Sequence, residues 1–419
     1  MSISSQPRGP LTGVRVVELA DEKGQFCGKL MADLGAEVIK VEPPHGEAAR
    51  SVGPFFEDVP HPERSISFWH YNTSKRGVTL NLETEGGRAL FRRLAAKADV
   101  LLETLPPGRL AALGLGYEHL KELNPRLVVC SLTPFGQSGP WSGYASSDLL
   151  HLAAGGQMAS CGYDESDVPD APPIAPGGGN AWHMGGHYAY IAIVAALVHR
   201  TVTGRGQYID SSVHDACALT TEGGVAQYIY NGQVVRRQTG RHASPNPTPI
   251  TQFRCKDGKY VNMLFGLRIT PRQFRALLEW MESRGLAQDL PDERYQDPAV
   301  LRESVPHIHA VVREFIANLT QDDAYHGFQE RGFAMGAVRA PEDVAVDPHL
   351  RDRGFFVEVE HPELGRSFTY PGAVAIYGKT PWRVQRRAPL IGEHNIEVYC
   401  GELGLSQGEL AVLRESGVI

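Results

Sequence analysis

The segment 172–210 carries the residue types of this chain best suited to chemistry. Three consecutive glycines at 177–179 let the backbone approach a ligand or another backbone segment closely. His183 and His187 follow at a spacing of four, which places both imidazoles on one face of a helix, and imidazole titrates near neutral pH. The pair is therefore a candidate for acid–base catalysis, and its alternative role is packing at the start of a helix.

Metal binding is not indicated at these histidines or elsewhere. The sequence has no HExxH pattern, and no third ligand is evident near His183 and His187. The six cysteines are scattered and form no CxxC pair, which is typical of reduced thiols. We expect no metal centre and no disulfide framework.

A helix predicted over Met184–His199 has to position these histidines. Glycine, alanine and branched aliphatic residues occupy nearly all of its sides, so we expect it to be buried. A basic turn, Gly204-Arg205-Gly206-Gln207, follows and enters a strand. A buried helix that packs through small residues explains the same pattern without any site.

The N-terminal half alternates short apolar strands with helices, which predicts a parallel α/β sheet. The turn ADEKGQFCGK has no GxGxxG pattern, so we expect no nicotinamide site. The predicted elements are strands at Val14–Leu19, Val38–Val41, Asp99–Glu103 and Leu127–Leu132, and helices at Gly24–Leu34, Gly86–Ala98 and Tyr117–Leu123.

The middle of the chain has a different character. A hairpin is predicted around Asp257-Gly258, with helices at Pro271–Ser283 and Ser304–Leu319. Short β segments then return at Gly354–Glu360 and Ser367–Tyr377, before a helical tail at Asn395–Ser416. We expect a large domain from residues 1–225 and 331–419, interrupted by a smaller α+β domain at 226–330.

Composition excludes several function classes. The net charge of −7 argues against nucleic-acid binding. No apolar run approaches the ~20 residues that a membrane span requires, and the N-terminus MSISSQPRGP lacks the apolar core of a signal peptide. We expect a cytoplasmic protein with no nucleic-acid or membrane partner.

Ordered motifs along the whole chain resemble the class III CoA-transferases, a family that includes formyl-CoA and carnitine CoA-transferases and the related α-methylacyl-CoA racemases. The resemblance implies a Rossmann-like large domain built from both chain ends, a small domain and an interlaced dimer. The motifs are PLTGVRVVEL, ADLGAEVIKVEPP, NTSKRGVTLNL, FGQSGPW, AALVHRTVTGRGQYID and APLIGEHN.

The resemblance also implies a chemistry that this chain cannot complete in the usual way. In the transferases an aspartate before the buried helix attacks an acyl-CoA thioester and forms a mixed anhydride, then an aspartyl-CoA thioester. That position corresponds here to Trp182, and the racemase aspartate corresponds to Ala181. Neither side chain is a carboxylate.

Three explanations stay open. The chain resembles the aspartate-lacking subunit of benzylsuccinate-type CoA-transferases, in which a paired chain brings the aspartate. Alternatively it is an autonomous acyl-CoA racemase, isomerase or lyase with His183 and His187 as acid and base, or a different carboxylate, Asp148 or Glu22, takes over. A non-catalytic subunit that completes an interlaced assembly is a further possibility.

Ser146-Ser147-Asp148 also makes a natural helix N-cap, which favours a structural role for Asp148.

The family pattern implies a CoA site as well, with an acyl-CoA and a carboxylic acid as substrates. Two basic positions that are frequent in the family are here Pro43 and Ala112, for which Arg50 and Arg109 are candidate replacements. The implied CoA-binding residues are Glu22, Lys23, Lys75, Arg76, Leu80, Thr104, Leu105 and Arg109.

Overall fold

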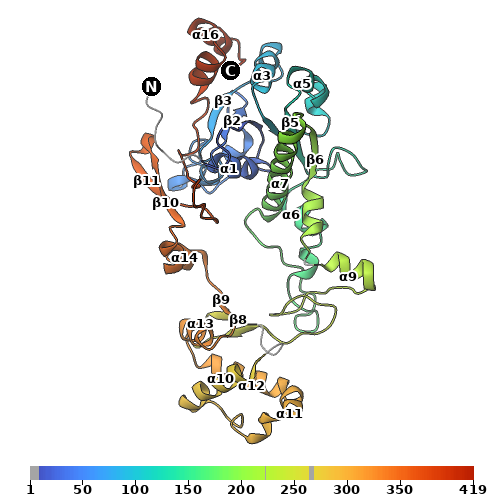
Figure 1. The fold of residues 1–419 in the computed structure, drawn as a ribbon, viewed down its shortest axis with the longest axis vertical. Helices are drawn as coiled ribbons and strands as arrows, with labels where there is room; N and C mark the ends of the chain where they lie inside the picture. Colours follow the sequence, from blue (N-terminus) through green and yellow to red (C-terminus); the bar gives the residue numbers. More distant parts are fainter. Residues whose placement is uncertain (1–8, 222, 264–268) are drawn as a thin grey trace. The chain divides into compact units, whose positions relative to one another are not determined.

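The computed structural model describes residues 9–221, 223–263 and 269–419 (Figure 1). Most of the N-terminal segment MSISSQPRGP, for which we expect no signal peptide, lies outside the described residues. The chain forms two compact units. The large unit comprises Met1–Gln157, Pro176–Glu222 and Pro348–Ile419, and the small unit comprises Met158–Ala175 and Gly223–Asp347. The domain ranges expected from the sequence stay a prediction.

A six-stranded parallel sheet forms the centre of the large unit, which confirms the predicted α/β class. Its strand order is β3-β2-β1-β4-β5-β6, so the chain runs outward from β1 in one direction and then from β4 in the other. The strands are β1 (Arg15–Leu19), β2 (Glu37–Glu42), β3 (Arg76–Thr79), β4 (Val100–Glu103), β5 (Val128–Thr133) and β6 (Tyr208–Ser212).

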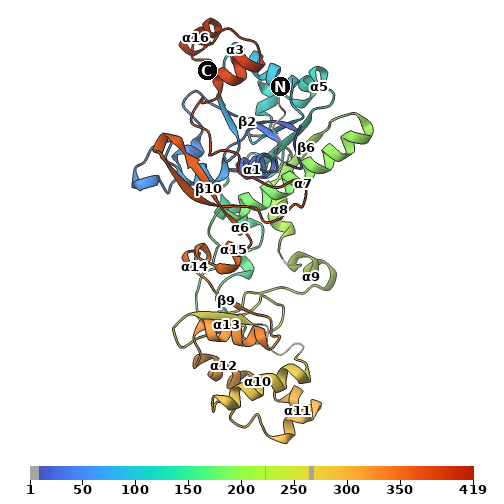
Figure 2. The ribbon, with the colours of Figure 1, turned by 60° about the vertical axis from the view of Figure 1, so that its left-hand side comes forward.

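Helices cover both faces of this sheet, and its inner strands β2, β4 and β5 are buried between the two helical layers. One layer holds α3 (Glu85–Ala96), α5 (Tyr117–Leu123) and α16 (Gln407–Glu415), which lie together in Figure 1 and Figure 2. The opposite layer holds α1 (Gln25–Asp33) and α7 (Asn180–Thr203), which pack against each other. Shorter helices are α2 (Ile66–Tyr71), α4 (Arg109–Ala112), α6 (Asp148–Ala154), α8 (Val213–Leu219) and α15 (Pro348–Asp352).

Helix α7 is longer than predicted and less buried. It begins after Gly179 and ends before Gly204, and both glycines have positive φ. A Cβ at Gly185 would lie 2.9 Å from a methyl group of Val213, so glycine permits the close approach to α8. The expected burial on nearly all sides is wrong for the chain by itself, because Ile191, Val198 and Val202 on one face are 57, 62 and 85% exposed.

The C-terminal segment closes the free edge of the sheet at β3. Thr79 donates its backbone N–H to Asn395 Oδ1 (2.9 Å), and its carbonyl accepts a hydrogen bond from the Tyr399 hydroxyl (2.8 Å). Gly77 and His394 exchange a further pair of hydrogen bonds. Side chains and loop backbone thus satisfy groups that an exposed edge strand would leave unpaired. A π-type helical segment, Ile396–Glu402, continues from this contact.

A buried ion-pair cluster links β1, β2 and the turn before β3. Glu18 Oε1 accepts hydrogen bonds from Lys40 Nζ (3.1 Å) and Lys75 Nζ (2.9 Å), and all three side chains are fully buried. Lys75 also donates to Asn72 Oδ1. A Cβ at position 28 would lie 1.6 Å from Glu18 Oε2, so only Gly28 leaves room for this carboxylate.

Outside the sheet, the large unit has an antiparallel hairpin of β10 (Phe356–His361) and β11 (Arg366–Pro371). Its side chains share a small core with Phe68 and Trp69. The predicted β segment at Ser367–Tyr377 is thus too long, because pairing with β10 ends at Pro371.

The small unit is an α+β body with its own apolar core. The predicted hairpin is confirmed as β7 (Gln252–Arg254) and β8 (Tyr260–Met263), and β9 (Met335–Ala337) pairs with β8. The helices are α9 (Gly224–Asn231), α10 (Pro271–Ser283), α11 (Pro298–Glu303), α12 (Val305–Ala317), α13 (Gln321–Glu330) and α14 (Pro341–Ala345).

Glu18→Gln should lower the free energy of unfolding by about 3–5 kcal/mol, because it leaves two buried lysines without their shared counter-charge. Chemical denaturation of the variant and the wild-type protein measures this loss. Glu118→Gln is the matched control, since it removes an exposed ion pair with Lys121 and should cost less than about 1 kcal/mol. Equal effects of the two substitutions would contradict the role assigned to the cluster.

Candidate functional site

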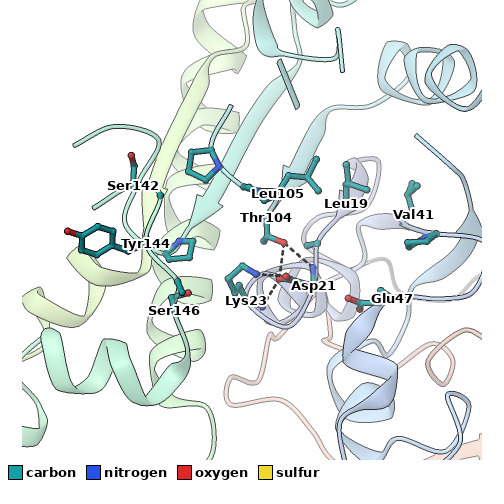
Figure 3. A pocket seen from close by; sticks show the side chains of 17 residues that line it. Leu19, Asp21, Lys23, Val41, Glu47, Thr104, Leu105, Ser142, Tyr144 and Ser146 are labelled. Atoms are coloured by element: carbon teal, nitrogen blue, oxygen red, sulfur yellow. Dashed lines mark hydrogen bonds and ion pairs between the residues drawn. The ribbon is translucent and has the colours of Figure 1, made fainter. Parts of the chain in front are cut away.

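A cavity of about 570 Å³ lies where β1 and β4 end. The strand order reverses between these two strands, and the loops that leave their carboxyl ends diverge there, which is the usual place of a ligand site in such sheets. Leu19, Ala20 and Asp21 line the cavity after β1, and Thr104 and Leu105 line it after β4. Val41, Pro43, Glu47 and the loop segment 142–146 complete the wall (Figure 3).

Three of the lining residues form one hydrogen-bonded group at the centre of this wall (Figure 3). Thr104 donates its hydroxyl to Asp21 Oδ1 (2.9 Å) and accepts the backbone N–H of Asp21 (3.0 Å). The Lys23 ammonium pairs with the same carboxylate. The charge of Lys23 is therefore already compensated inside the protein.

Glu47 lines the cavity from the side of β2. Its Oε1 lies 2.7 Å from Lys40 Nζ, which connects the cavity wall to the buried Glu18 cluster. Burial raises the pKa of Glu47, and the neighbouring Lys40 opposes that increase. Sequence reasoning missed Glu47, because only the packed structure shows that a loop carboxylate turns inward.

The structure brings some of the expected CoA-binding residues to the cavity and others elsewhere. Lys23, Thr104 and Leu105 line it, whereas Leu80 is 2% exposed within the apolar core. Lys75 is buried on Glu18. The remaining basic side chains bind carboxylates instead: Arg76 pairs with Glu37, Glu397 and Glu402, Arg109 with Glu83, and Arg50 with Glu42 and Glu63.

A second group of polar side chains meets at the first turn of α7. Asp148 accepts the backbone N–H of Ala181 through Oδ1 at 2.7 Å, so a carboxylate from α6 satisfies the start of α7. Ser147 is the N-cap of α6 and accepts the N–H of Leu150, as the Ser-Ser-Asp pattern predicts. Trp182 is half-buried and packs edge-on against His151 with ring centroids 5.5 Å apart.

His183 has a hydrogen-bond partner that the sequence did not indicate. Its Nε2 lies 2.7 Å from the Tyr71 hydroxyl, and the ring of Phe26 packs against it at 4.5 Å. Burial and the neighbouring His187 lower the pKa of His183, while burial and Asp148 raise the pKa of Tyr71. Both groups are therefore neutral near pH 7, which suits hydrogen bonding and proton transfer.

Glu22 and His187 lie at the margin of this group. Burial raises the pKa of Glu22, and the negative charges of Asp21 and Asp148 add to the increase. His187 is exposed, and its Nδ1 lies 2.9 Å from the backbone carbonyl of His183. The roles expected for Glu22, Asp148, His183 and His187 stay predictions.

His151 is the most unusual histidine of the large unit. It is fully buried among aromatic rings, and within the described residues neither ring nitrogen has a hydrogen-bond partner. Burial lowers its pKa to about 4, so the imidazole is neutral at physiological pH.

The described residues contain no cluster of three or more potential metal ligands. No helix within them has the length and apolar character of a membrane span.

Wild-type stability should fall as the pH decreases from about 6.5 toward 4, because the unfolded state takes up a proton that folded His151 refuses. This one group contributes at most about 1.4 kcal/mol per pH unit. His151→Phe should remove that share of the slope, so its stability relative to the wild type should increase at low pH. Denaturation curves from pH 4.5 to 7.5 measure the difference, and parallel slopes would contradict it.

Comparison with known proteins agrees with the α/β fold of the chain. The chain is 34% identical over 97% of both chains to succinyl-CoA:(R)-benzylsuccinate CoA-transferase subunit BbsE of Thauera aromatica. It is 32% identical to the succinyl-CoA–L-malate CoA-transferase beta subunit of Chloroflexus aurantiacus, over 98% of both chains. A solved CaiB/BaiF family protein from Brucella suis matches with a TM-score of 0.79 and 30% identity, over 94% of this chain and 100% of that one. Residues 11–395 match the family model CoA-transferase family III, which confirms the resemblance in the sequence: the chain belongs to this family.

Proposed function

We propose that this chain is the aspartate-lacking subunit of a heteromeric CoA-transferase, which moves CoA between an acyl-CoA and a carboxylic acid. The observation that carries the proposal is the first turn of α7. By the family pattern the transferase aspartate corresponds to Trp182 and the racemase aspartate to Ala181, and neither side chain can form an acyl anhydride. The attacking aspartate then has to come from a second, homologous chain.

The names of two relatives support a heteromer. The proteins from Thauera aromatica and Chloroflexus aurantiacus are each named as a subunit of a CoA-transferase, and both match nearly the full length of this chain. Other relatives of similar identity are named without a subunit, such as the succinate–glutarate CoA-transferase of Agrobacterium fabrum. Membership of the family therefore does not decide whether a chain works alone or as one subunit of a heteromer, and this is inferred from the residues.

The exposed face of α7 supports a partner chain. Ile191, Val198 and Val202 present aliphatic side chains to solvent at helical spacing, which is costly for an isolated subunit. A second copy or a homologous subunit in an interlaced dimer would cover this face.

All six cysteines are free thiols in the structure, which favours the reducing cytoplasm as the compartment.

Asp148 is a poor substitute for the missing nucleophile. Its Oδ1 accepts the N–H of Ala181, which ties the carboxylate to the helix start. We assign Asp148 to positioning the first turn of α7.

Tyr71 and His183 favour one alternative, an autonomous acyl-CoA racemase, isomerase or lyase. The 2.7 Å contact couples a phenol to a neutral imidazole beside Asp148, and such a pair can accept and return a proton at a substrate carbon. This activity needs no covalent acyl-enzyme and hence no nucleophile on α7.

The purified chain alone should not exchange CoA between succinyl-CoA and candidate carboxylic acids, because it lacks the attacking carboxylate. Co-expression with a homologous chain that carries the aspartate should produce exchange, measured by chromatography of the CoA esters. An Asp→Asn variant of that partner is the matched control and should be inactive. Full activity of the chain alone, with hydroxylamine-sensitive acylation of one carboxylate, would overturn the proposal.

The alternative makes a separate prediction for the chain alone. If Tyr71 and His183 transfer protons, a branched acyl-CoA in deuterium oxide should gain deuterium at its α-carbon, as seen by mass spectrometry. His183→Gln should reduce the incorporation at least about tenfold, and Tyr71→Phe should change its pH profile. His187→Gln is the control on the same helix. An absence of exchange in the wild-type protein would remove this alternative.

A further inference from the structure

Two adjoining cavities lie beside strand β7 and helix α12 of the small unit. Their volumes are about 620 and 350 Å³, which is the usual size of small-molecule sites. They share the lining residues Ile250, Phe253, Ala310 and Arg313, so they form one continuous hollow, which we call the α12 groove. Every described residue that lines it belongs to the small unit, so the inference is independent of the proposed function.

The sequences of α12 and β7 explain why a hollow with charged walls forms here. Ala310 and Ala317 lie about two turns apart on the exposed face of α12, and their short side chains leave space beside Arg313. On β7, Phe253 points into the core of the small unit, whereas the next residue, Arg254, points outward. Arginines from two elements therefore border the same space.

The α12 groove is rich in positive charge, although the chain as a whole carries a net charge of −7. Arg241, Arg254 and Arg313 line the groove, and none of them forms an ion pair with a carboxylate of the described residues. Arg241 Nη1 donates to the backbone carbonyl of Thr248 (3.2 Å), which is a neutral group. The three guanidinium charges are therefore not compensated by ion pairs inside the small unit.

Two other polar side chains of the groove already have partners. Glu314 is the one carboxylate among the described lining residues, and its Oε2 accepts a hydrogen bond from Gln288 Nε2 (2.6 Å). His307 Nε2 lies 2.6 Å from Asp289 Oδ1. Three arginines against one lining carboxylate leave an excess of positive charge, which a bound anion would compensate.

The remaining walls select the kind of anion. Guanidinium groups are weakly hydrated and bind the oxygens of a carboxylate or a phosphate through two parallel N–H donors. Between the arginines the lining is apolar, with Ile250, Val305 and Ala310. An inorganic ion gains nothing from such a surface, whereas an organic anion buries its apolar body against it.

We propose that the α12 groove is a binding site for an organic anion that has an oxyanion head group and an apolar body. The head group, a carboxylate or a phosphate, binds Arg241 and Arg313, which line the same cavity of about 350 Å³. The apolar body lies over Ile250 and Ala310. The cavity at the ends of β1 and β4 belongs to the large unit, so this is a second site.

Isothermal titration of the intact chain with three probes tests the proposal. Phenylacetate carries a carboxylate, phenyl phosphate carries a phosphate, and benzyl alcohol is the neutral compound with a similar body. One of the two anions should bind at least about tenfold more tightly than benzyl alcohol, and the tighter anion identifies the head group. Added salt should weaken its binding, because it screens exposed charges. Equal binding of the alcohol and both anions would overturn the proposal.

Arg313→Gln should weaken the binding of the tighter anion about ten- to a hundredfold, as expected for the loss of a charge-assisted hydrogen bond. Arg275→Gln is the matched control, since it makes the same change at an exposed position of α10 that does not line the groove. It should keep the wild-type affinity. Equal affinities of the wild-type protein and Arg313→Gln would contradict the assigned site.

A local readout in the wild-type protein does not depend on whether a variant folds. With the alanine methyl groups labelled for NMR, the signals of Ala310 and Ala317 should shift as the anion is added. Anion binding that leaves both signals unchanged would place the ligand elsewhere, such as in the cavity of the large unit, and would overturn the inference. The CoA-exchange assay of the proposed function has its own outcome, so either idea can fail without the other.

Discussion

The buried Glu18 carboxylate is the constraint on which the large unit depends. It lies on β1 and binds the ammonium groups of Lys40 and Lys75. Lys75 belongs to the turn before β3, and Lys40 also pairs with Glu47, so the carboxylate connects several elements. A charge in such a place has to be compensated locally. Gly28 of α1 has no side chain, and this leaves the space that the Glu18 carboxylate of β1 occupies.

The first turn of α7 carries no carboxylate of its own. Asp148 of α6 anchors this turn, and the side chains that follow are an alanine and an indole packed against a neutral imidazole. The hydrogen bond beside it joins Tyr71 of α2 to His183 of α7. Such a surface can shape and hold an acyl group, whereas covalent transfer requires a group that the first turn of α7 does not provide.

Local patterns predicted the elements of the sheet because apolar runs and glycine stops act over a few residues. The predicted bounds of β1, β2, β4 and β5 lie close to the observed ones, and the hairpin lies at Asp257-Gly258 as expected, whereas β3 was not predicted as a strand. Contacts between distant segments were not predictable: the Tyr71–His183 hydrogen bond spans 112 positions, and nothing near Tyr71 marks it. The partners of the basic residues in the NTSKR turn were not predictable for the same reason, since Lys75 and Arg76 meet carboxylates of other elements that lie far away in the sequence.

The closure of β3 by residues 394–399 has a consequence for synthesis on the ribosome. The strand is made more than three hundred residues before the groups that satisfy Thr79 and Gly77. The nascent large unit must therefore keep an open edge during translation of the whole small unit. An unpaired strand edge is prone to non-native pairing, so the stable edge of the sheet forms only once residues 394–399 have been made.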